Sequence, residues 1–214
     1  MLISETNKYI FIANPKTGTS TIQKYLWSLD NSLQGNSFTI NSKKINAGEH
    51  ITAFRLKKLM GEEYDKYKKI VYVRNPYAKV VSGYFFYKKG GKDKYDKNRS
   101  KRKLVRGLNI LLVKYIPFKI WSLIHPYKSN KSYITDANNN IIVDYIGRTE
   151  HLEDDLAGIL SKIGLEYDTS TFSSTNKSKH SDPMDYYKNP IHKFLFDILR
   201  GKDIRFYNSV VSKL

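Results

Sequence analysis

The chain has 214 residues, no cysteine and a formal net charge of +17, with 37 lysines and arginines against 20 acidic residues. This length fits one domain with a sizeable core, and the lack of cysteine excludes disulfide scaffolds and cysteine-based zinc sites. Hydrophobic residues make up 40% of the chain, enough to offset the entropy of folding, and the positive charge favours an anionic partner.

The first predicted element is a short buried strand at 9–13, where aromatic and β-branched residues run together. It leads into a loop of small polar residues at 14–21. Apolar residues then recur at helical spacing between Ile22 and Leu29. The segment therefore predicts a strand, a loop and a helix in succession.

A short helix is predicted at 52–60, with Leu56, Leu59 and Met60 facing inward. A second strand, loop and helix follow. Apolar residues at 70–73 predict the strand, and the sequence RNP at 74–76 ends it. One face of the next helix is marked by Val80, Val81, Tyr84 and Phe85.

The C-terminal half continues the same pattern. Strand-like runs at 132–135 and 141–146 flank a turn rich in asparagine at 136–140. A helix is predicted at 152–163, with Gly164 as its C-terminal cap. A last helix has an apolar face formed by Ile191, Phe194, Leu195 and Ile198.

Strands that alternate with helices predict an α/β fold with a central parallel sheet covered by helices on both sides. We see no repeat and no clear second domain, so residues 1–214 are interpreted as a single domain. The apolar run near the N-terminus is too short for a signal peptide, and no apolar stretch reaches the length of about 18 residues that a membrane span needs. Together with the lack of cysteine, this favours a cytoplasmic protein.

Residues 88–106 carry ten basic side chains against two aspartates. One interpretation is a mobile, solvated insertion whose charges repel one another. The other is a segment that draws an anionic acceptor toward a nearby site, because it follows directly on the helix after residue 76. The sequence leaves both open.

The loop after the first strand is built to bind an anion. Its small residues let backbone N–H groups approach a ligand, its hydroxyls add donors, and Lys16 adds a full charge beside the start of a helix. The loop is P-loop-like, but a P-loop has its lysine at the end, next to the hydroxyl that binds magnesium. Here the lysine comes early, and no paired aspartates indicate a metal. An ordinary turn with a helix cap is the alternative interpretation.

A second anion-binding site is predicted after the strand at 70–73. Arg74 leaves the end of that strand, and Ser82 follows inside the next helix. A guanidinium and a hydroxyl can hold a second phosphate. Ligands of open α/β sheets bind beyond the carboxyl ends of the strands. Both anion-binding sites should therefore bind the same ligand, which would have two anionic groups.

At this point the chain resembles a known family. The loop PKTGTST at 15–21 resembles the 5′-phosphosulfate loop of sulfotransferases that use 3′-phosphoadenylyl sulfate (PAPS), and RNPYAKVVSGY at 74–84 is similar to their 3′-phosphate motif, RxPxxRxxSxY. The segments AGEHIT at 47–52 and IGRTEHL at 146–152, and the C-terminal run from Lys202 to Tyr207, resemble bacterial carbohydrate sulfotransferases. The resemblance covers nearly the whole chain, with 88–129 the least similar part.

The resemblance implies a sulfotransferase fold and transfer of a sulfonyl group from PAPS to a carbohydrate hydroxyl, which leaves adenosine 3′,5′-bisphosphate (PAP) and needs no metal. Lys16 would stabilise the leaving oxygen, and the 5′-phosphate would be held by Thr17, Gly18, Thr19, Ser20 and Thr21. Arg74 and Ser82 would hold the 3′-phosphate. The acceptor would be a glycan or polysaccharide, with an anionic one favoured by the basic segment; a tyrosine, a lipid or a small alcohol is the alternative acceptor.

A base must take the proton of the acceptor hydroxyl. His50 occupies the position of the histidine base in the related carbohydrate enzymes, and an imidazole, with an ordinary pKa of about 6.5, is largely neutral near physiological pH. Glu49 is the alternative base, since several sulfotransferases use a carboxylate. A surface histidine that flanks the helix at 52–60 is the structural alternative for His50.

Two further residues are candidates for phosphate contacts. Lys177 and Ser178 lie in a basic, hydroxyl-rich segment of the kind that closes over the phosphate of the donor in this family; a solvated loop is the alternative. Lys79 stands where the family usually has arginine, so we assign it no contact with the donor. Thr149 replaces a usual aromatic residue.

Two other functions compete with sulfonyl transfer. A metal-dependent kinase of the P-loop type would share the strand, loop and helix, but would need a lysine at the end of the loop and a metal carboxylate. A basic nucleic-acid-binding protein would explain the charge, but no recognition helix or RNP-type aromatic strand is evident. We therefore expect no nucleic-acid partner, and the sequence carries no signal for an oligomeric state.

Overall fold

The computed structural model describes residues 1–40, 42–90, 113–168, 172 and 181–214. The chain divides into two compact units. The first unit comprises residues 1–75, 129–176 and 206–214, and the second comprises 76–128 and 177–205. The basic segment at 88–106 lies mostly outside the described residues.

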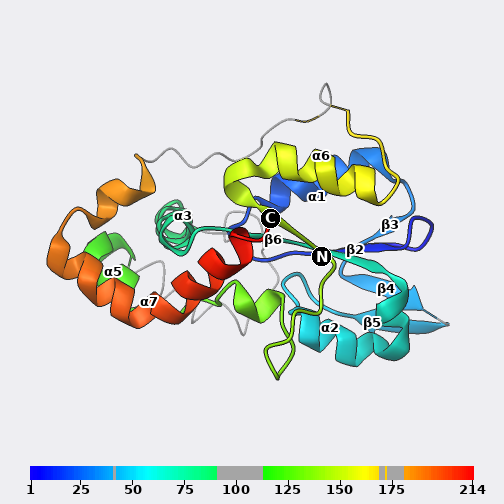
Figure 1. The fold of residues 1–214 in the computed structure, drawn as a ribbon, viewed down its shortest axis with the longest axis horizontal. Coiled ribbons are helices and arrows are strands. Elements are labelled where there is room, and N and C mark those ends of the chain that lie inside the picture. Colours follow the sequence, from blue (N-terminus) through cyan, green and yellow to red (C-terminus); the bar gives the residue numbers. More distant parts are fainter. Residues whose placement is uncertain (41, 91–112, 169–171, 173–180) are drawn as a thin grey trace. The chain divides into compact units, whose positions relative to one another are not determined.

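A five-stranded sheet forms the centre of the first unit, in the order β3-β1-β2-β6-β7 (Figure 1). Its strands are β1 (Leu2–Ser4), β2 (Tyr9–Ile12), β3 (Leu33–Gln34), β6 (Lys68–Val73) and β7 (Tyr145–Arg148). β2, β6 and β7 are parallel, whereas β1 is antiparallel to both β2 and β3. Four of the five strands thus run in one direction, which confirms the predicted α/β class with a mostly parallel sheet.

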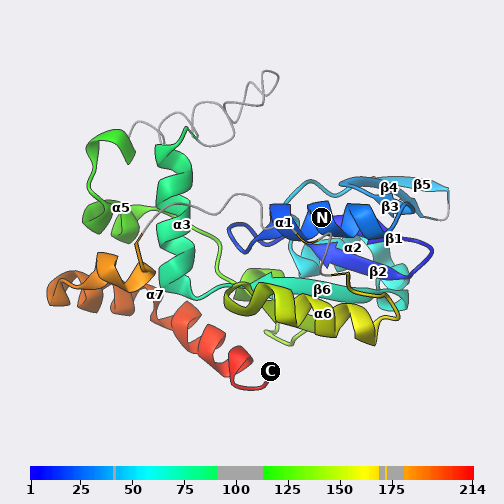
Figure 2. The same cartoon turned by 90° about the horizontal axis from the view of Figure 1, so that it is seen from above.

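Alternate residues of the central strands feed two hydrophobic cores, one on each face of the sheet. On one face, Phe11 and Tyr72 pack with the apolar residues of α1 (Thr19–Leu29) and α6 (Leu152–Lys162). These two helices lie side by side over the sheet in Figures 1 and 2. The period of two in the strands and the period of 3.6 in the helices are therefore satisfied together.

The opposite face, which carries Ile12 and Val73, packs against shorter elements. These are the hairpin of β4 (Ser37–Ile40) and β5 (Lys43–Asn46), α2 (Ala53–Met60), the 3-10 helices η1 (Gly61–Lys66) and η2 (Lys131–Tyr133), and the end of α7 (Pro190–Val211). The sheet is thus covered on both faces, as predicted.

In its described residues, the second unit contains α3 (Pro76–Lys88), α5 (Phe118–Ile124), the 3-10 helix η4 (Pro183–Tyr187) and α7 as far as residue 205. Its core is aromatic, with Tyr84, Phe118, Trp121, Tyr187 and Phe196 all buried. Because aromatic side chains are large, a few of them are enough to fill the space between these short helices.

Four details of the sequence prediction were wrong. The strand predicted at 141–146 begins only at Tyr145, as β7. Leu59 is exposed, because the buried face of α2 is formed by Ala53, Leu56 and Met60. Residues 132–135 do not form a strand: backbone N–H groups there bond back to Asn130 and Lys131, which leaves a single bridge between Thr135 and Ile141. The predicted apolar face of α7 points to solvent rather than into the core.

Candidate functional site

The candidate site lies in the first unit, where three parallel strands end at one edge of the sheet. The register pairs Ile12 of β2 with Val71 of β6, and Val73 of β6 with Arg148 of β7. The loop before α1, the Arg74 segment and the 3-10 helix η3 (Thr149–His151) therefore leave the sheet next to one another. This is the edge at which open α/β sheets bind their ligands.

The loop between β2 and α1 is held in a tight, irregular conformation. Lys16 and Gly18 both have positive φ, 66° and 71°. The hydroxyl of the buried Thr17 donates to the Asn14 carbonyl at 2.8 Å, and the Gly18 carbonyl accepts from the backbone of Thr21 at 3.0 Å. Within the described residues α1 has no side-chain cap and no acid in its first turn, so its positive end is not neutralised there.

Gly18 meets two requirements at once. Its backbone is in the left-handed region, which is energetically unfavourable for a residue with a side chain. A Cβ at this position would also lie 2.4 Å from Cδ1 of Leu152, at the start of α6. The loop thus packs directly on the segment that follows β7, and a side chain at position 18 would be strained in φ and would have to displace the end of the Leu152 side chain.

A pair of buried amides joins the ends of β2 and β6. The Asn14 amide donates to the Tyr72 carbonyl at 2.9 Å and to the side-chain oxygen of Asn130 at 3.1 Å. Asn130 in turn donates to the Arg74 carbonyl at 2.8 Å. Both asparagines are fully buried. The backbone on either side of Arg74 is therefore fixed to the start of the Lys16 loop.

The Arg74 side chain turns back toward that loop. Its Nη1 donates to the Lys16 carbonyl at 3.1 Å. Burial lowers the pKa of the Arg74 guanidinium, and the nearby Glu150 opposes this shift. An arginine keeps its charge at neutral pH even so, and its fork has several further N–H donors. The arrangement brings a partly buried cation against the loop that carries Lys16.

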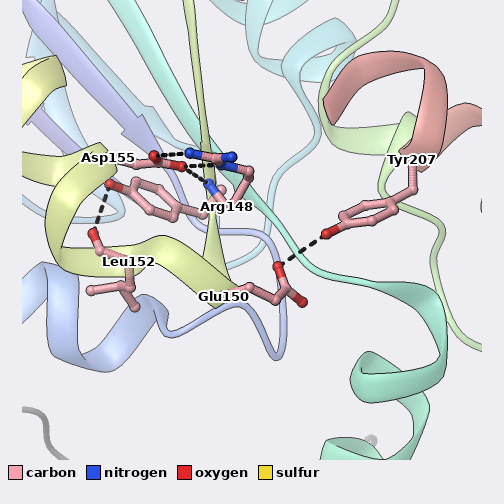
Figure 3. Close-up of polar contacts among 6 residues, drawn as sticks. Arg148, Glu150, Leu152, Asp155 and Tyr207 are labelled. Carbon is pink, nitrogen blue, oxygen red and sulfur yellow. Dashed lines mark hydrogen bonds and ion pairs between the residues drawn. The ribbon is translucent and has the colours of Figure 1, made fainter. Parts of the chain in front are cut away.

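Glu150 supports the same segment from η3. One carboxylate oxygen accepts from the Asn75 backbone at 2.8 Å, and the other accepts from the Tyr207 hydroxyl at 3.1 Å (Figure 3). The Thr149 hydroxyl donates to the Val73 carbonyl at 2.7 Å. The residues after β7 therefore fix the backbone on both sides of Arg74.

Arg148 and Asp155 anchor α6 to β7 beside these contacts (Figure 3). Asp155 accepts from the Arg148 backbone at 2.6 Å and from Nε and Nη2 of its guanidinium at 2.9 and 2.7 Å. Burial works to raise the pKa of Asp155, but the hydrogen bonds from Arg148 hold it below its ordinary value. The carboxylate is thus a structural partner and not a proton donor.

His50, which lies just before α2, contacts the backbone where β2 leads into this loop. Its Nδ1 lies 2.9 Å from the Ala13 carbonyl, which can only accept, so Nδ1 carries the hydrogen. In the neutral ring the lone pair is then on Nε2, the state that a general base requires. The Glu49 carboxylate lies 3.8 Å from Nε2, and both side chains are about one-third exposed.

The structure thus brings together, within the first unit, most of the predicted site: Lys16, Thr17, Gly18, Thr19, Ser20, Thr21, Glu49, His50 and Arg74. Ser82 is buried in α3 of the second unit, so its partnership with Arg74 stays a prediction. Lys177 and Ser178 lie outside the described residues. Lys79 has a local role, since its Nζ donates to the Lys128 carbonyl at 3.0 Å.

Sequence reasoning missed the residues that support the site. Asn14 and Asn130 are 116 positions apart, and nothing local in the sequence predicts that their amides meet. Glu150 lies in a segment that the family resemblance covered, but its contact with Asn75 depends on how β6 and β7 pair. Tyr207 arrives from the C-terminal helix.

Comparisons with known proteins identify a family for this chain. A family model described as the sulfotransferase family matches residues 1–207. A protein of Archaeoglobus fulgidus, described as uncharacterized, is 34% identical over 115 residues, which are 53% of this chain and 82% of that protein. No solved structure matches the chain. In the part of the chain that the structure describes, no helix is long and apolar enough to cross a membrane, and no three histidine or acidic side chains cluster as metal ligands.

Proposed function

Because this chain belongs to the sulfotransferase family, we propose that it transfers a sulfonyl group from PAPS to a hydroxyl of a carbohydrate acceptor and releases PAP. The observation that carries the proposal is that Arg74 and His50 both bond to the backbone of the loop that holds Lys16. This transfer requires cations to stabilise the developing negative charge and a neutral base to take the acceptor proton. Lys16 and Arg74 would be the cations, and His50 would be the base.

The chemistry of the loop fits an anionic donor. Helix α1 begins with its positive end toward the loop, and its first turn has no acidic residue. The backbone and hydroxyls of 17–21 would hold the 5′-phosphate, and Arg74 would hold the 3′-phosphate together with Ser82. Lys177 and Ser178 would add contacts to a phosphate. No step of the proposal needs a metal.

In the reaction, the bond between sulfur and the bridging phosphate oxygen breaks and a bond from sulfur to the acceptor oxygen forms. Nε2 of His50 would take the acceptor proton, and the Ala13 carbonyl would hold the ring in the required tautomer. Glu49 would stabilise the imidazolium from 3.8 Å, or would itself be the base. Lys16 would neutralise the charge that develops on the leaving oxygen.

The carbohydrate acceptor rests on the resemblance of 47–52 and 146–152 to carbohydrate sulfotransferases. An acidic glycan also fits the net charge of +17, because opposite charge raises the local concentration of acceptor.

Transfer from radiolabelled PAPS to fractionated glycans tests the proposal. We expect His50→Ala and Lys16→Ala each to lower the rate about 100- to 10,000-fold. Lys162→Ala removes an exposed lysine at the far end of α6 and serves as the matched control. Glu49→Gln distinguishes the two candidate bases. A small loss of transfer rate favours His50 as the base, and a loss of rate as large as that of His50→Ala favours Glu49.

Two results would contradict the proposal. One is transfer at the wild-type rate by both His50→Ala and Lys16→Ala. The other is phosphoryl transfer from labelled ATP with no transfer from PAPS, which would favour the kinase alternative.

A further inference from the structure

Helix α7 exposes an apolar stripe to solvent. Ile191, Phe194, Leu195, Ile198 and Leu199 follow one another at helical spacing, and their exposed fractions run from 42% to 70%. We call these five residues the α7 stripe. All of them belong to the second unit.

The α7 stripe is not needed for the core of that unit. The opposite face of α7 already packs inward, with Phe196 fully buried and His192 bonded to Ser122 at 2.8 Å. A surface helix normally has one apolar face, whereas this segment has two. An outward row of large apolar side chains usually marks an interaction surface.

Cations extend the same face of α7. Lys202 and Arg205 lie at helical spacing after Ile191 and Ile198, in line with the α7 stripe, and both are exposed. Exposed Lys188 lies just before the helix, paired with Asp185. The outward row therefore passes from apolar to basic along the helix.

The charge of the whole second unit has the same sign. Its residues include 21 lysines and arginines against 6 acidic residues, a net of +15, whereas the first unit has 16 against 14, a net of +2. Nearly all of the net charge of the chain thus belongs to the unit that carries the stripe.

We propose that the α7 stripe docks this protein on the surface of an anionic lipid membrane. An amphipathic helix of this kind buries its apolar side chains at the boundary between headgroups and acyl chains, while lysine and arginine contact the anionic headgroups. A second copy of the chain fits less well, because two units of +15 would repel each other. Nucleic acid would use the charge but not the row of isoleucine, leucine and phenylalanine.

Flotation of the full chain with lipid vesicles tests the proposal. The wild type is expected to bind vesicles of phosphatidylcholine mixed with phosphatidylglycerol, to bind vesicles of phosphatidylcholine alone much less, and to dissociate as salt is raised. The double variant Phe194→Gln with Ile198→Gln is expected to lose about tenfold or more in binding. The matched control is Trp27→Gln with Leu59→Gln, two exposed apolar residues of the first unit.

The absence of cysteine from the chain allows a second measurement. An environment-sensitive fluorophore on Phe194→Cys should shift to the blue when anionic vesicles are added, and the same label on Trp27→Cys should not. Three results would overturn the proposal: no binding by the wild type, equal binding by the stripe variant, or a dimer in sedimentation that the stripe variant converts to monomer. Transfer to a soluble acceptor should be the same in wild type and stripe variant, so this test is independent of the proposed reaction.

Discussion

Replacing Asn14 with aspartate tests whether the buried amide pair holds the two site loops together. The change keeps the size of the side chain but removes both N–H donors. The two partner atoms, the Tyr72 carbonyl and the side-chain oxygen of Asn130, can only accept at these contacts. A carboxylate would therefore face two oxygens inside the protein.

The expected loss of stability follows from these contacts. A buried acceptor that loses a donor costs about 1–3 kcal/mol, although the Asn130 oxygen still accepts from the Arg74 backbone at 3.4 Å. A buried carboxylate that faces two oxygens adds several kcal/mol unless it takes up a proton. We expect Asn14→Asp to lower the free energy of unfolding by about 3–6 kcal/mol near neutral pH. Asn14→Ala should lose less, about 2–4 kcal/mol, because it buries no charge.

The deficit of Asn14→Asp should also depend on pH. Burial beside two acceptors raises the pKa of the new carboxyl above its value in the unfolded chain, so the folded state binds the proton more tightly. Stability should therefore be highest at acid pH and should fall as the pH rises through that raised value, relative to Asn14→Ala.

Urea denaturation followed by circular dichroism measures both effects. Asn208→Asp, on an exposed position of α7, is the control and should change stability by less than about 0.5 kcal/mol. If Asn14→Asp is as stable as the wild type, or more stable than Asn14→Ala near neutral pH, the amide pair does not do what we infer.

Three further changes probe the contacts around the loop. Gly18→Ala forces an L-residue to positive φ and a Cβ against Leu152, so urea denaturation should show a loss of about 2–3 kcal/mol, whereas Gly35→Ala meets open space and should be near neutral. Asp155→Asn should lower the free energy of unfolding by about 1–2 kcal/mol at neutral pH. Because hydrogen bonds hold the pKa of Asp155 low, the wild type should lose this advantage as the pH falls through that pKa. Equal acid sensitivity of the wild type and the variant would contradict the reasoning. Glu150→Ala should weaken PAP binding measured by calorimetry about tenfold, and Glu150→Gln, which keeps an acceptor for the loop after β6, should restore most of it; no rescue would refute this role.

Local periodicity was enough to predict the central elements of the fold. The strand at 9–13, the strand at 70–73 and the helices after them appear close to their predicted bounds, because buried strands and amphipathic helices have strong patterns. β1 and β3 are only three and two residues long, too short to carry a pattern. The hairpin of β4 and β5 was missed as well.

Periodicity does not determine which face of a helix is buried when both are apolar. On α7 the row containing Ile191 and Phe194 and the row containing His192 and Phe196 both follow helical spacing, with steps of three or four residues. The structure buries the second row. The difference arises from contacts with α5, which a local pattern does not contain.

The predicted site depended on short motifs. Such motifs indicate the residues that contact a ligand better than the residues that hold the ligand-binding loops in place. Lys16, His50 and Arg74 could be proposed from the sequence. Their supports could not, because Asn130 and Glu150 lie far along the chain from the loops they contact and meet them only in the folded protein.

The most direct test of the account is calorimetric titration with PAP and with adenosine 5′-monophosphate, which lacks the 3′-phosphate. We expect the wild type to bind PAP more tightly, and Arg74→Lys to lower the affinity for PAP toward that for adenosine 5′-monophosphate while leaving the latter nearly unchanged, since lysine cannot grip a phosphate with a fork. Equal affinity of the wild type for the two nucleotides, or an equal loss of both in the variant, would contradict the claim that Arg74 holds the second phosphate beside the Lys16 loop.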